Sequence, residues 1–78
     1  MTQMTKGLYP TNYHSVKIKM RDGTKISGKL NTGEFERIYD MLKQLPHKYI
    51  AISDAKYGSV TGKTLIVNVS EIIWIEPD

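Results

Sequence analysis

The chain has 78 residues, of which 40% are hydrophobic and 24% are charged, and it contains no cysteine. A chain of this length forms one domain with a thin core, and without cysteine it has neither disulfides nor thiolate metal sites. Eleven Lys and Arg residues against eight Asp and Glu give a net charge of +3, which permits an anionic partner but does not require one. The two histidines, His14 and His47, lack local metal-ligand spacing, so we expect no metal ion or other cofactor.

Residues 1–14 show no hydrophobic period. We expect them to form an arm, either loose or docked on a single domain at residues 15–78. Residues 1–7 lack the apolar run of a secretory signal. The longest apolar runs, such as residues 72–75, are far too short to cross a bilayer. We therefore predict a cytoplasmic protein with no membrane partner.

A β-hairpin is predicted at the start of the domain. Hydrophobic residues alternate with lysines over residues 15–21 and again over residues 24–31, which is typical of half-buried strands. The intervening Asp22-Gly23 pair is a turn signal.

The length of the hairpin loop decides which residues pair. A two-residue loop would place an apolar residue of one strand opposite a lysine of the other, and so mix the two faces. A three-residue loop over 21–23 pairs Ile18 with Ile26 and gives Gly23 the left-handed position that such a loop needs. We predict the three-residue loop.

A helix is predicted after the hairpin, over residues 34–45, from an apolar stripe with helical spacing. Asn31 or Thr32 can cap its start, and Pro46 ends it. The stripe has these members: Phe35, Ile38, Tyr39, Leu42 and Leu45.

Three further strands are predicted near residues 48–53, 63–69 and 71–76, with a loop or turn over 54–62. The last two strands are apolar at nearly every position, so both of their faces should be covered. The barrel interior would cover one face, and the helix, the N-terminal arm or another subunit would cover the other. The predicted fold is therefore mainly β: a small, partly open barrel of about five strands, with an amphipathic helix between the second and the third.

One segment is similar to a phosphate-binding loop. Residues 58–64 contain two glycines followed by Lys and Thr, but the glycines are one residue too close together and an apolar strand follows instead of a helix. We reject this motif. No nucleophile and base can be recognised either, so we predict a protein that is not an enzyme and has no small-molecule ligand.

The basic face of the predicted hairpin is the candidate site for an anionic partner. Its members are four lysines and an arginine at the rim: Lys17, Lys19, Lys25, Lys29 and Arg21. One interpretation is a solvated face whose charges discourage aggregation. The other is a contact with the phosphates of RNA or DNA. No aromatic residue interleaves with these lysines in the sequence, so base stacking is not expected there.

The two apolar strands at the C-terminal end are the candidate interface for a homo-oligomer. An unpaired strand edge is a template for pairing with another chain, and tryptophan favours interfaces. The candidate interface residues are Leu65, Val67, Val69, Ile73 and Trp74. Two functions follow: a non-catalytic interaction module that self-associates through edge strands, and alternatively a barrel that binds RNA or DNA through the basic hairpin.

Several segments resemble the Sm-like (LSm-type) small β-barrels. Residues 16–23 and 26–30 are similar to the first motif of that family, with an alternating strand, an Asp-Gly turn and a Gly in a bent second strand. Residues 50–55 resemble the third strand, and residues 65–75 resemble the fourth strand, short turn and fifth strand. The resemblance implies an Sm/SH3-like barrel and side-by-side strand pairing into a ring. The chain departs from the family in its helix, which members carry before the first strand, and in lacking the Asp-x-hydrophobic-Asn element that contacts RNA, so the family's RNA site is not implied.

Overall fold

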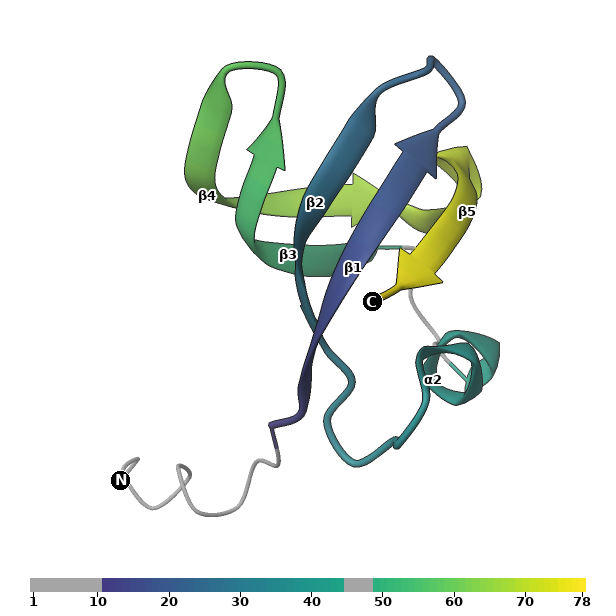
Figure 1. Ribbon diagram of the computed structural model, residues 1–78. Helices are drawn as coiled ribbons and strands as arrows, with labels where there is room; N and C mark the ends of the chain where they lie inside the picture. Colours follow the sequence, from purple (N-terminus) through teal and green to yellow (C-terminus); the bar gives the residue numbers. More distant parts are fainter. Residues whose placement is uncertain (1–10, 45–48) are drawn as a thin grey trace.

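The computed structural model describes residues 11–44 and 49–78 (Figure 1). These residues form one open sheet of five antiparallel strands and one short α-helix. The elements in chain order are β1 Tyr13–Met20, β2 Lys25–Asn31, α2 Ile38–Gln44, β3 Tyr49–Tyr57, β4 Val60–Asn68, the 3-10 turn η1 Val69–Glu71 and β5 Ile72–Pro77. The strand order is β4-β3-β2-β1-β5, so β4 and β5 are the two ends of the sheet.

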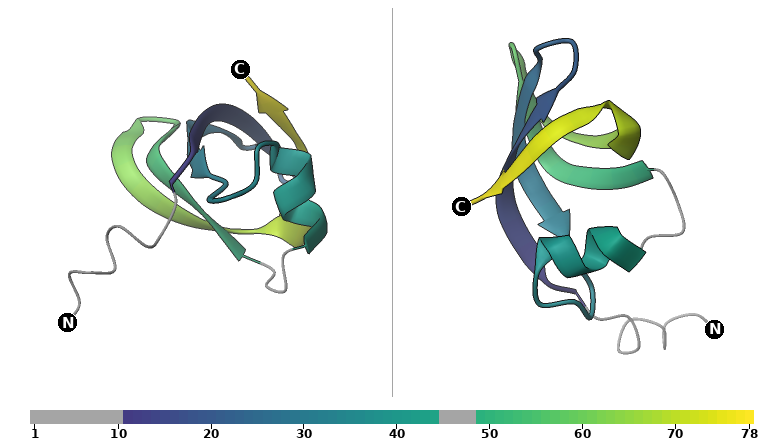
Figure 2. Two further views of the ribbon diagram at one scale, coloured as in Figure 1. Left: turned by 90° about the horizontal axis from the view of Figure 1, so that it is seen from below. Right: turned by 90° about the vertical axis from the view of Figure 1, so that its right-hand side faces the viewer.

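The sheet is strongly curved. β3 and β4 each bend, so that their two halves run in different directions (Figure 1). The register shifts between Ile52 and Ala55 in the β3–β4 pairing, and Asp54 takes a positive φ of 54° within that stretch. Such bulges bend a strand and increase its twist. Viewed from below, the curved strands surround a common interior, with α2 beside them (Figure 2).

The β1–β2 hairpin has the predicted register. Ile18 pairs with Ile26, and the loop between Met20 and Thr24 has the expected three residues. Gly23 has a φ of 95°, the left-handed conformation that glycine adopts without strain. Asp22 Oδ1 accepts a hydrogen bond from the Thr24 backbone N–H at 2.9 Å, and the Thr24 bonds hold the pKa of this carboxyl below its ordinary value. Short-range turn chemistry therefore sets this register.

β2 and β3 approach each other closely at Gly28. A Cβ at this position would contact the Ile52 side chain and lie 2.9 Å from the Ser53 carbonyl oxygen. The β2–β3 register also shifts between Ser27 and Lys29, on either side of Gly28. The glycine is needed here because the backbone of β3 occupies the space of a side chain.

The helix is shorter than the sequence predicted, and its orientation differs. It spans Ile38–Gln44 rather than residues 34–45, and it buries Ile38 and Met41, while Tyr39 is 69% exposed. Met41 was not in the predicted stripe. The predicted members Phe35 and Leu42 are partly buried against the core, whereas Leu45, the stop at Pro46 and His47 lie outside the described residues.

The sequence suggested that Asn31 or Thr32 caps the helix, but neither does so. Their side chains form hydrogen bonds within the loop that precedes the helix. The buried Thr32 hydroxyl donates to the Phe35 carbonyl oxygen at 2.7 Å and lies 3.1 Å from His14 Nε2. Asn31 Oδ1 accepts from the backbone N–H of Asn12 at 2.7 Å and of Gly33 at 2.9 Å. These bonds satisfy polar groups of the loop and connect it to Asn12, just before β1. The strand begins at Tyr13, two residues before its predicted start. The rest of the predicted arm, residues 1–10, lies outside the described residues.

The predicted loop over residues 54–62 is wrong. β3 continues to Tyr57 and β4 begins at Val60, with Gly58 and Ser59 as a two-residue turn. Gly58 has a φ of 57°, which suits a tight hairpin. The segment that resembled a phosphate-binding loop, residues 58–64, is therefore a tight turn and the first part of β4, without the strand-to-helix turn that such a loop requires.

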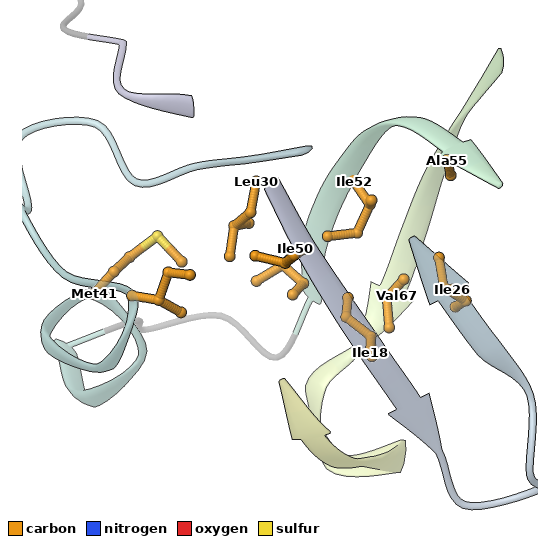
Figure 3. Close-up of a cluster of buried hydrophobic side chains, with 10 residues drawn as sticks. Ile18, Ile26, Leu30, Met41, Ile50, Ile52, Ala55 and Val67 are labelled. Carbon is orange, nitrogen blue, oxygen red and sulfur yellow. The ribbon is translucent and has the colours of Figure 1, made fainter. Parts of the chain in front are cut away.

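The core lies inside the curved sheet and extends to α2 (Figure 3). Met41 reaches from the helix toward Leu30 and Ile50, and β5 adds the partly buried Ile72 and Ile75. The buried members are Val16, Ile18, Ile26, Leu30, Ile38, Met41, Ile50, Ile52, Ala55 and Val67. No helix in the described part of the chain is long and apolar enough to cross a bilayer.

Candidate functional site

The predicted lysines lie together on the outer face of the sheet. In β1 the exposed Lys17 and half-buried Lys19 alternate with the buried Val16 and Ile18. In β2 the exposed Lys25 and Lys29 likewise alternate with buried apolar residues. Successive residues of a strand point to opposite faces, so the four lysines share the face that points away from the core. We call these four residues, together with Lys56 of β3, the basic face.

The register gives the basic face a regular order. Lys25, Lys19 and Trp74 form one row across β2, β1 and β5. The next row is Lys56, Ser27, Lys17 and Glu76, across all three of those strands and β3. Side chains directly opposite each other on paired strands are neighbours. Five lysines from three strands thus lie close together, with Glu76 on the β5 side.

Sequence reasoning missed Lys56 because it fell in the predicted loop. Its place on the face depends on β3 continuing past the bulge at Asp54 and pairing Lys56 with Ser27. The ion pair within the described residues is Arg37 with Asp40, on α2 and the turn before it, at 3.0 Å. In the described part of the chain, therefore, no carboxylate lies within ion-pair distance of the basic face. Its charge is available to an anionic partner.

A shallow depression lies at the centre of the basic face. Its lining includes Lys17, Lys29 and Lys56, with Ser15 and Ser27 between them and Gly28 at its floor. Gly28 contributes backbone atoms to this lining, because its missing side chain would point inward against Ile52. Asp54 and Asp78 also line the depression. Hydroxyl groups and lysine ammonium groups donate hydrogen bonds that phosphate oxygens can accept.

Arg21 does not line this depression. It lies in the β1–β2 turn, where its backbone N–H donates to the Glu71 carbonyl oxygen at 2.8 Å. It lines a different hollow with Met20, Tyr57 and Leu65. The predicted rim residue therefore lies outside the depression.

β4 and β5 present the second candidate surface, because each is paired on one side only in the described residues. The exposed apolar side chains on these strands are Ile66 at 63%, Ile73 at 57% and Trp74 at 42%. Ile73 is left without a partner where the β1–β5 register shifts between Lys19 and Met20. Exposed apolar residues on both edges are unusual, since edge strands more often carry charges.

The other predicted interface residues face the chain's own core. Val67 is buried at 3% exposure, and Leu65 and Val69 pack against the core cluster. Ile66, which the sequence analysis did not select, is the exposed residue of that strand. Ile66 points outward because successive residues of a strand face opposite sides. The sequence did not show this, because every residue in this run is apolar.

An apolar groove lies between α2 and β5. Ile38, Tyr39 and Leu42 line one side, and Ile73, Trp74 and Pro77 are among the residues of the other side. Its volume is about 460 Å³. The groove continues the apolar surface of the β5 edge toward the helix.

Comparison of the chain with models of known protein families, with curated proteins and with solved structures gave no match. The two surfaces therefore have to be interpreted from their own geometry. Within the described residues no three His, Cys, Asp or Glu side chains are placed to hold a metal ion.

Proposed function

We propose that the protein is a non-catalytic interaction module that self-associates through the edge strands β4 and β5. One observation carries the proposal: the two end strands of the open sheet both expose large apolar side chains. An edge strand offers unpaired backbone N–H and C=O groups to a second strand. Pairing would satisfy these groups and remove Ile66 and Ile73 from water. Either a ring or a dimer would do so.

The finer interpretation of the fold supports the same function. The Sm-like resemblance implies a small barrel that pairs strands with its neighbours, and a partly open barrel leaves β4 and β5 available for this. A thin core is a further reason, because small domains without disulfides or metals gain stability from oligomerisation.

Light scattering over a range of concentrations tests self-association. The wild-type chain should have a mass that is a multiple of 8.9 kDa, and Ile66→Lys should reduce it while the chain stays folded, because this side chain is exposed. Ser59→Lys adds the same charge in the β3–β4 turn, outside the strands, and should leave the mass unchanged. Val67→Lys should unfold the chain instead, since Val67 is buried. A monomeric wild type at every accessible concentration would contradict the proposal.

A second candidate function is RNA or DNA binding through the basic face. It is favoured by the position of five lysines on one face, none of them in an ion pair within the described residues. Replacing Lys17, Lys19, Lys25 and Lys29 by Gln should leave the fold intact, as exposed substitutions change the free energy of unfolding by about 0.5 kcal/mol or less. At low salt the wild type should retain nucleic acid and this variant should not. Salt separates the two functions, because phosphate contacts weaken steeply with ionic strength and apolar self-association does not.

A further inference from the structure

An exposed tryptophan lies beside the basic face. The sequence gives no sign of this, because Trp74 is in the last strand and the lysines are in the first hairpin. The β1–β5 pairing places Trp74 directly opposite Lys19. Ile75, the next residue of β5, pairs with the buried Ile18. By strand alternation Trp74 therefore belongs to the outer face, where it is 42% exposed, and it also lines the groove beside α2.

A second exposed aromatic residue lies at the other end of β1. Tyr13 is 55% exposed and is on the same face as Lys17 and Lys19, since the three positions are separated by even numbers of residues along one strand. The six positions from Tyr13 to Lys19 correspond to about 20 Å of strand. Aromatic side chains thus flank the lysines in space, although none interleaves with them in the sequence.

The depression over Gly28 lies between the two aromatic residues. Its three lysines, Lys17, Lys29 and Lys56, come from three neighbouring strands and outnumber the two carboxylates of the lining, Asp54 and Asp78. Positive charges that follow a backbone, combined with aromatic side chains on which bases stack, are the two parts of a surface that binds single strands.

We propose that the basic face binds single-stranded nucleic acid. Phosphates contact Lys17, Lys29 and Lys56 at the depression, and unpaired bases stack on Trp74 and Tyr13. This proposal rests on the second candidate function and adds to it the class of ligand. A duplex fits the face less well, because its bases are stacked on each other and present no free ring to Trp74.

Strand pairing and base stacking can occur together on β5. Pairing with a second chain uses the backbone groups along the outer edge of the strand, whereas stacking uses the Trp74 ring on the face of the sheet. The nucleic-acid site is therefore complete in one chain and does not require an oligomer.

Trp74 is the single tryptophan of the chain, so its fluorescence reports directly on the site. The probes are oligouridine and oligothymidine of about 12 nucleotides, within the range of roughly 4–16 that one small barrel occupies. Both should quench Trp74 fluorescence at low salt, and their relative affinities distinguish RNA from DNA. A duplex of the same length should bind more weakly, and inorganic phosphate should leave the fluorescence unchanged.

Substitutions separate stacking from charge. Trp74→Leu should weaken single-strand binding roughly five- to hundred-fold, as expected for the loss of one stacked base, and Trp74→Phe should restore most of the affinity. Tyr13→Leu should also weaken binding, whereas Tyr39→Leu, on the exposed side of α2, is the matched control. Lys56→Gln should reduce the slope of log affinity against log salt by about 0.7, and Lys43→Gln on α2 should not.

The outcomes distinguish the two levels of the proposal. Equal binding of single strands and duplex, with no change in Trp74 fluorescence, would overturn the stacking surface while leaving nucleic-acid binding in place. Undiminished binding by Trp74→Leu, shown by circular dichroism to be folded, would overturn it as well. If the wild type binds none of the probes at low salt, the second candidate function fails and this inference fails with it.

Discussion

At the scale of single residues, Gly28 is the position where the sheet tolerates least change. The Ser53 carbonyl oxygen and the Ile52 side chain occupy the space that a Cβ would need. Neither neighbour can move without disturbing the bend in β3, because Ile52 is fully buried. The missing side chain of Gly28 therefore matters on the inner face of the sheet, where it makes room for the close approach of β3.

We predict that Gly28→Ala lowers the free energy of unfolding by about 1–3 kcal/mol, the usual cost of overpacking. Chemical denaturation measures this. Ser27→Ala, at the exposed neighbouring position, is the control and should change stability by about 0.5 kcal/mol or less. Equal stability of Gly28→Ala and wild type would show that β2 and β3 are farther apart than in this structure.

The lowered pKa of Asp22 predicts that the stability of the fold depends on pH. Its pKa is lowered from the ordinary value of 3.8 by hydrogen bonds from Thr24. A carboxyl group with a lower pKa in the folded state stabilises the fold above its unfolded pKa, and this contribution is lost as the pH falls through the folded pKa. The Asp22 side-chain resonance should therefore titrate below pH 3.8. Asp22→Asn should remove this contribution and flatten the acid limb of stability, and a titration at or above the ordinary value would contradict the turn geometry.

At the scale of elements, α2 shows how a short helix is oriented by its packing. Seven residues form a helix that is marginal by itself, so contacts with the sheet decide which side is buried. Met41 enters the core beside Leu30 and Ile50, and Tyr39 remains outside, with the Lys43 ammonium group 5.1 Å from its ring centre. The predicted apolar stripe was therefore wrong on one side of the helix: Ile38 is buried, but Tyr39 is exposed.

We predict that Met41→Ala lowers the free energy of unfolding by about 2–5 kcal/mol, because it leaves a cavity in the core. Leu42→Ala should cost less, since Leu42 is only partly buried, and Tyr39→Ala should cost least. Thermal or chemical denaturation of the three variants gives the order. A larger loss for Tyr39 than for Met41 would mean that the helix is rotated about its axis.

At the scale of the whole molecule, the open sheet exposes apolar side chains on the two strands at its ends. In the pairing order β1, β2 and β3 lie between β4 and β5, while the curvature of the sheet brings the end of β4 to the start of β5, where η1 joins them (Figure 1). The inner faces of the end strands contribute to the chain's own core, through Val67 and Ile75. What remains open is the outer edge of each strand and the few side chains beside it.

Amide hydrogen exchange tests this arrangement without any substitution. Outward-facing backbone N–H groups of β4 and β5 should exchange rapidly in dilute protein and slowly in concentrated protein, because association would give them hydrogen-bond partners. Amides in β1 and β2, which lie inside the sheet, serve as the internal control. Protection of the edge amides that is independent of concentration would indicate that one chain covers its own edges.

The sequence by itself determined the features that depend on neighbours along the chain. The β1–β2 register was predictable because Asp22 and Gly23 favour one loop length, and because a slip by one residue would bury lysines. The mainly β class was predictable from period-two segments with one helical interruption. The boundaries of β3 and β4 were missed because a bulge at Asp54 and a two-residue turn at Gly58 look the same in sequence as a longer loop.

The tertiary structure alone decided which distant residues meet. Lys56 joins the basic face because β3 continues past its bulge and pairs with β2, and Trp74 joins it because β5 returns to pair with β1. Which side of an apolar strand faces out was also decided by packing, since Ile66 and Val67 are equally apolar and only their positions on the sheet differ. The physical reason is the same in each case: cross-strand contacts depend on the pairing of whole strands, and no local preference encodes them.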